Sequence, residues 1–125
     1  MGDHGGGQST LKQVASELDR QWRAKGAHVY YIGDAYYKSE EQVREYLGGR
    51  AKAAGGHAGI HDTSEVMFLD KEQKWIRRDK LAAADPNAGV EGDPREASAE
   101  LGKAFLEIKI NSAVAQIKTL LAANR

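Results

Sequence analysis

The chain has 125 residues, which is enough for one domain with one modest hydrophobic core. Its 18 Lys and Arg residues balance 18 Asp and Glu residues, so its charge indicates neither nucleic acid nor an anionic membrane as a partner. The lack of cysteine excludes disulfides, thiolate metal ligands and cysteine nucleophiles. No apolar run reaches membrane-spanning length and no signal pattern opens the sequence. We therefore expect a cytoplasmic protein with a single domain over residues 1–125.

The first motif is Asp-His-Gly-Gly-Gly-Gln at residues 3–8. Glycine permits positive φ angles and a close approach of a ligand to the backbone, so Gly5, Gly6 and Gly7 are expected to form a cofactor-binding turn. The free N–H groups at the start of the next helix would favour an anion there. A frayed N-terminus is the alternative interpretation of these glycines.

Two elements are expected directly after this motif. The first is a helix over 9–25, ended by Gly26, because four apolar residues share one face at helical spacing. These residues are Leu11, Val14, Leu18 and Trp22. The second is a buried strand over 27–33, since the run is apolar, β-branched and aromatic. Asp34 follows this strand, where the ligand crevice of an open α/β sheet lies.

Further helices are expected downstream. Ser39 is expected to cap a helix that the glycines at 48–49 weaken, and Thr63 or Ser64 a short helix that ends at Leu69.

One long helix is expected over 95–122, after a loop over 85–94 that contains both prolines. Only one strand is apparent beside these helices, and a single strand is not a stable sheet. We therefore expect the chain to complete its sheet by symmetric self-association, as a homo-oligomer.

A second polar cluster lies in an expected turn at residues 57–62. His57 and Asp62, with His61 between them, are residue types that share a metal or form an acid–base pair. A solvated loop without chemistry is the alternative. An α/β-hydrolase mechanism is excluded because no Gly-x-Ser-x-Gly elbow accompanies the glycine run.

Three segments occur in the order typical of one enzyme family. They are residues 3–8, His-Ala-Gly-Ile-His-Asp-Thr-Ser at 57–64, and Gly-Asp-Pro-Arg-Glu-Ala-Ser-Ala-Glu-Leu-Gly at 92–102. Together they resemble the creatininase (creatinine amidohydrolase) family. The resemblance implies an α/β fold, with three α/β/α layers and a mainly parallel sheet, assembled into oligomers. It also implies a two-metal hydrolase that uses zinc or manganese on C–N amide bonds of small substrates.

The resemblance assigns roles to individual residues. His4 matches the metal-binding His of the family's His-Gly-Gly turn, and Asp62 stands where many members have a Glu near the metals. His57 matches an active-site His that assists proton transfer. Two positions depart from the pattern, because Gly7 replaces an Asn and Ile60 replaces a frequent Glu.

Family members are longer than this chain, and their first half carries a Glu, a His and an Asp that bind and bridge the two metals. The resemblance therefore covers the C-terminal half, and we expect a truncated domain without those three ligands. The first expected function is metal-dependent amide hydrolysis with weak or altered activity. The alternatives are a non-catalytic oligomeric α/β remnant of such an enzyme, and a small-anion binder at the glycine turn.

Overall fold

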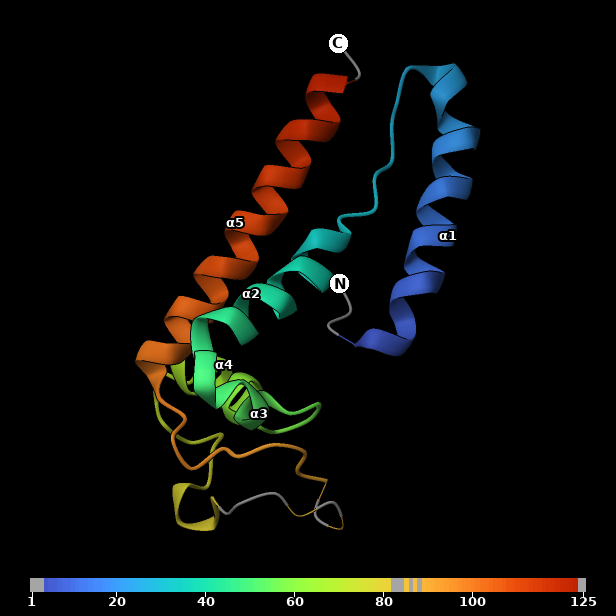
Figure 1. The fold of residues 1–125 in the computed structure, drawn as a ribbon. Coiled ribbons are helices and arrows are strands. Elements are labelled where there is room, and N and C mark those ends of the chain that lie inside the picture. The colour runs from blue at the N-terminus through green and yellow to red at the C-terminus, as the bar shows by residue number, and fades with distance from the viewer. Residues whose placement is uncertain (1–3, 82–84, 86, 88, 124–125) are drawn as a thin grey trace.

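The computed structural model describes residues 4–81, 85, 87 and 89–123. Over these residues the protein is helical (Figure 1), with 70% helix and no sheet. Its α-helices are α1 (Gly5–Trp22), α2 (Tyr37–Leu47), the single turn α3 (Ala51–Ala54), α4 (Ile60–Leu69) and α5 (Ala99–Ala123). Short 3₁₀ turns lie at Arg23–Lys25, Gly33–Ala35, Gly48–Arg50 and Arg78–Lys80. None of the described helices is both long and apolar enough to cross a membrane.

The expected α/β fold with a three-layer parallel sheet is wrong. The apolar run before Gly33 is not helical, and it connects α1 to α2 as an elongated chain (Figure 1). In the described part of the chain, β pairing is limited to two isolated bridges, His57 with Glu91 and Asp85 with Val90. A β-branched, aromatic run favours an extended backbone, but a sheet also needs a second strand. The side chains of this run line a groove between α1 and α5 instead.

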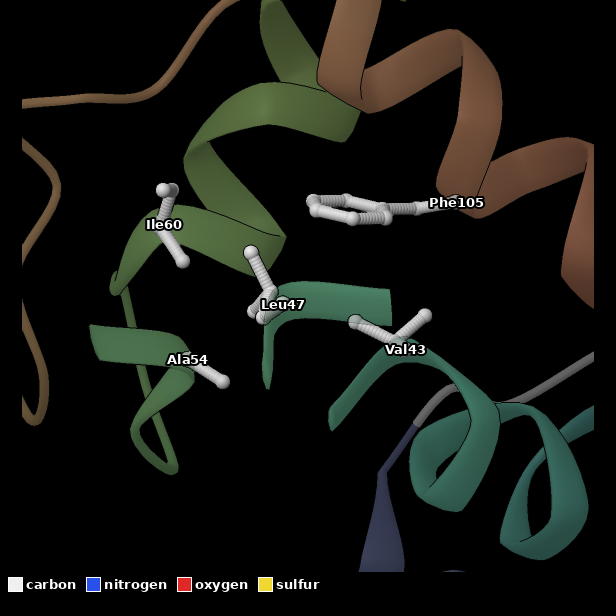
Figure 2. Packing of buried hydrophobic residues seen from close by; sticks show 5 residues of the cluster. All are labelled: Val43, Leu47, Ala54, Ile60 and Phe105. Atoms are coloured by element: carbon white, nitrogen blue, oxygen red, sulfur yellow. The ribbon is translucent and has the colours of Figure 1, made fainter. Parts of the chain in front are cut away.

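The hydrophobic core lies where α2, α3, α4 and α5 meet (Figure 2). Phe105 of α5 is completely buried at its centre, and the rings of Tyr46 and His61 meet it edge-on. The buried apolar cluster consists of Val43, Leu47, Ala54, Ile60 and Phe105. These residues come from four helices, so the cluster holds the body of the protein together by removing apolar surface from water.

The most extensive helix contact in this body joins α4 to α5. Gly102 is buried there, and a Cβ atom added to it would lie 1.9 Å from the carbonyl oxygen of Ser64. The hydroxyl of Ser64, which is fully buried, accepts a hydrogen bond from the backbone N–H of Ser98 at 3.2 Å. The absence of a side chain at position 102 therefore sets the distance between the two helices.

Helix α1 lies outside this body. It makes no extensive contact with any other α-helix, and Figure 1 shows the elongated segment running beside it. Polar contacts attach it to that segment: Tyr31 donates its hydroxyl hydrogen bond to Gln8 Oε1 at 2.7 Å, and Asp19 Oδ1 accepts one from the Val29 N–H at 3.1 Å.

Several expected helix boundaries are shifted. The first helix begins at Gly5 instead of residue 9, and the last begins at Ala99 instead of residue 95. Ser39 is not a cap, because its hydroxyl lies inside α2 and donates to the carbonyl oxygens of Ala35 and Tyr36. At Ser39 the residue type favours a cap, but its hydrogen bonds to backbone carbonyl oxygens place it inside the helix.

The start of α4 is also shifted. Thr63 lies within α4, and its hydroxyl donates a hydrogen bond to the Ala58 carbonyl oxygen at 3.1 Å. The expected end at Leu69 is confirmed, as is the interruption of α2 by the glycines at 48–49, where Gly48 has a φ of 54°. The loop expected over 85–94 is non-helical apart from Asn87, although positions 86 and 88 lie outside the described residues.

The Gly102→Ala substitution is expected to lower the free energy of unfolding by about 1–3 kcal/mol, because the added methyl group would overlap the Ser64 carbonyl oxygen. The measurement is urea denaturation followed by circular dichroism. Gly7→Ala is the matched control: Gly7 is helical and has no atom within 4 Å of an added Cβ, so alanine should raise stability by about 0.5–1 kcal/mol. Equal stability of the wild type and Gly102→Ala would contradict the close crossing.

Candidate functional site

The glycine motif forms the beginning of α1. His4 is the residue that precedes the helix, and its carbonyl oxygen accepts hydrogen bonds from the Gly7 N–H at 3.1 Å and the Gln8 Nε2 at 3.2 Å. Gly5 and Gly6 lie in the first helical turn, and neither they nor Gly7 has a positive φ. The expected glycine loop is thus a helical turn. The His4 side chain is exposed and lies beside Gly6, where an added Cβ would be 3.1 Å from its Nε2.

The second motif forms the turn that precedes α4. Asp62 Oδ2 accepts a hydrogen bond from the backbone N–H of Ala58 at 2.9 Å, at a residue whose φ is 52°. The exposed His57 is anchored through its carbonyl oxygen, which accepts a hydrogen bond from the Glu91 N–H at 2.7 Å. Asp62 therefore stabilises a strained turn.

The third motif forms the connection into α5. The carboxylate of Asp93 accepts hydrogen bonds from the guanidinium and the backbone N–H of Arg95, and these contacts lower the pKa of Asp93 to about 2. The N–H of Asp93 donates to the Ala53 carbonyl oxygen at 3.0 Å. Ser98 Oγ accepts a hydrogen bond from the Leu101 N–H at 3.2 Å and so caps α5.

The donor residues do not fit a metal centre within the described residues. A catalytic zinc ion takes three protein ligands and keeps one position open. Across residues 4–81, 85, 87 and 89–123, no group of three His, Asp or Glu side chains is placed to hold a metal ion. The recorded contacts of His4 stay within the first turn of α1, whereas those of His57 and Asp62 belong to the turn before α4.

Comparison with known proteins identifies the family. The creatininase family, described as creatinine amidohydrolase, matches residues 1–117 of the chain. The chain therefore belongs to the creatininase family, as the three motifs indicate. No curated protein and no solved structure matches it.

The structure also surrounds His61, a member of the second polar cluster, with charged residues that the sequence does not single out. His61 is buried, with its Nε2 3.2 Å from Glu65 Oε1 and its Nδ1 3.9 Å from Glu40 Oε1. Lys109 Nζ donates to Glu65 Oε2 at 3.2 Å. The cluster links α2, α4 and α5 around the edge of the core, and the four-residue spacing of His61 and Glu65 was the available signal.

The charge of Glu65 depends on these contacts. Burial alone raises the pKa of its carboxyl group, but the hydrogen bond from His61 and the positive charge of Lys109 outweigh burial and leave the pKa below its usual value of 4.5. A carboxyl group whose pKa is lower in the folded state stabilises the fold above its unfolded-state pKa. That contribution is lost as the pH falls through the folded-state pKa.

Glu65→Gln is therefore expected to make stability less dependent on pH below about 4.5, because the glutamine cannot gain a proton. The measurement is the melting temperature as a function of pH, from neutral pH down to the pH at which the protein unfolds. Glu107→Gln provides the control, since Glu107 is on the surface and pairs only loosely with Lys103 at 3.8 Å. An acid profile of Glu65→Gln that matches the wild type would show that Glu65 has an ordinary pKa.

Proposed function

We propose that this protein acts on the C–N amide bond of a small substrate, the reaction class that the family description names. The match over residues 1–117 is the observation that carries the proposal, because it spans all three motifs. The proposed contributions are His57 in proton transfer, and His4 and Asp62 as donors to zinc or manganese. The chain is proposed to correspond to the C-terminal half of the family.

The chemistry of the donor set limits this activity. Metal-dependent amide hydrolysis needs a metal held by several protein ligands, which polarises the substrate carbonyl group. Asp62 already accepts a hydrogen bond from Ala58. The described residues of one chain offer no complete ligand set. Activity of the isolated chain is therefore expected to be weak.

A second candidate function is a non-catalytic role, in which the chain keeps the family's motifs as structural elements. One observation favours it: the polar residues Asp62, Asp93 and Ser98 each hold a turn or a helix start in this structure. Under this alternative, neither added metal nor a chelator would change the melting temperature of the protein.

Metal titration distinguishes the two functions. The purified chain would be stripped with a chelator and titrated with zinc and then manganese by calorimetry. If the chain is a metal-dependent hydrolase, it binds metal, and both His4→Ala and Asp62→Ala weaken the binding. His28→Ala is the control, because the recorded contacts of the His28 ring are with Asp19 and Tyr30.

Turnover is measured next, with creatinine and a panel of linear and cyclic amides, with and without each metal. Hydrolysis that needs metal and is lost in His57→Ala supports the enzyme. No metal binding and no turnover under any of these conditions would refute it and leave the non-catalytic role.

A further inference from the structure

The loop that follows α4 is organised by one buried carboxylate. Asp70, the residue directly after α4, is 4% exposed, and its Oδ2 accepts a hydrogen bond from the backbone N–H of Trp75 at 2.6 Å. Burial raises the pKa of Asp70, but the backbone N–H groups of residues 73–76 outweigh burial and leave the pKa below its usual value of 3.8. The loop is therefore folded around Asp70, which holds the backbone of Trp75 in a defined position.

The side chain of Trp75 is largely in solvent. It is 68% exposed, the highest value for a large apolar side chain in the part of the chain that the structure describes. Leu69, the last residue of α4, is 53% exposed. Removing apolar side chains from water is favourable, so a tryptophan that an ordered loop holds in solvent is a candidate contact for a partner.

The same loop carries an excess of positive charge. Residues 71–80 contain five cations and two carboxylates, which leaves three positive charges, whereas the whole chain has a formal net charge of zero. The cations are Lys71, Lys74, Arg77, Arg78 and Lys80. The two carboxylates pair inside the loop, Glu72 with Lys74 at 2.5 Å and Asp79 with Lys80 at 3.9 Å. The excess is thus carried by the other three cations.

Two of these cations have no carboxylate partner among the described residues. Arg78 interacts electrostatically with Glu100 of α5, but Lys71 and Arg77 form no recorded ion pair. The Lys71 ammonium lies 4.1 Å from the centre of the Phe68 ring, at the end of α4. The loop therefore offers an exposed tryptophan and unpaired positive charge to the same partner.

This combination fits the surface of an anionic phospholipid bilayer. Tryptophan is enriched at the boundary between headgroups and acyl chains, because its ring is apolar and its N–H finds polar partners there. Anionic headgroups attract lysine and arginine side chains next to it. A single-stranded nucleic acid would also use the ring and the cations, but base stacking leaves Leu69 exposed, whereas lipid can cover it. The apolar and charged side chains together favour lipid.

We propose that residues 70–80 form a membrane-binding loop, in which Trp75 enters the headgroup region of an anionic bilayer and the cations beside it contact lipid phosphates. The contact is peripheral, and it weakens as salt is added because exposed charges are screened. The C-terminal end of α1 takes no part in it, since this end and the turn Arg78–Lys80 lie at opposite ends of the molecule (Figure 1). The loop acts independently of the proposed catalysis.

Cosedimentation of the full chain with phospholipid vesicles tests the proposal. Vesicles of phosphatidylcholine with about 30% phosphatidylserine should bind the chain, and pure phosphatidylcholine should bind it about tenfold more weakly or less, because it lacks net headgroup charge. Trp75→Ala should lower binding about tenfold, and it keeps the backbone N–H that Asp70 accepts. Lys74→Gln combined with Arg77→Gln should lower binding about 25-fold, at about fivefold for each cation.

Trp22→Ala is the matched control. Trp22 is also exposed, at 48%, and it is the last residue of α1, so this variant should bind the anionic vesicles as the wild type does. Equal binding to both kinds of vesicle, or unchanged binding of Trp75→Ala, would overturn the proposal. Absence of vesicle binding together with binding of a single-stranded oligonucleotide or of polyglutamate would also overturn it, and would assign the loop to that other partner.

Tryptophan fluorescence locates the contact. The chain has two tryptophans, so Trp22→Phe leaves Trp75 as the reporter and Trp75→Phe leaves Trp22. With anionic vesicles, the emission of Trp75 should shift to shorter wavelength and be quenched by brominated phospholipid, and the emission of Trp22 should not change. A response from Trp22 without one from Trp75 would place the contact at the other end of the molecule and refute the proposal.

Discussion

The crossing of α4 and α5 is the contact on which the rest of the body depends. It places the Ser64 carbonyl where a Cβ of residue 102 would otherwise be, and so brings Phe105 within reach of α2 and α4. The interior is small, so this one aromatic ring contacts much of it (Figure 2). The same proximity lets Lys109 on α5 reach Glu65 on α4. Packing and electrostatics at this junction therefore stabilise the same arrangement.

The family's motifs have local structural roles in this protein. Asp62 and Asp93 each accept backbone N–H groups at a chain reversal, which is a common role for short acidic side chains. The Oδ2 atom of Asp62 would have to give up its hydrogen bond from Ala58 or share it in order to bind a metal ion. Family membership therefore does not by itself assign a role to these residues, and the geometry of this chain shows which contacts they make.

Local patterns in the sequence predicted helices well and tertiary pairing badly. The apolar spacing of Leu11, Val14 and Leu18 correctly indicated α1, because helical periodicity depends only on neighbours along the chain. The run before Gly33 is typical of a sheet strand, but strand pairing depends on a distant partner that no local pattern shows. The approach of His61 to Glu40 is not predicted for the same reason, since Glu40 lies in another helix.

The attachment of α1 has a consequence for local stability. Asp19 accepts a hydrogen bond from Val29, and Gln8 accepts one from Tyr31, both residues of the segment that follows α1. Helix α1 makes no extensive contact with another α-helix. Because it buries few contacts, α1 is expected to open at a lower free energy than the helices around Phe105. Amide hydrogens of α1 would exchange with solvent first.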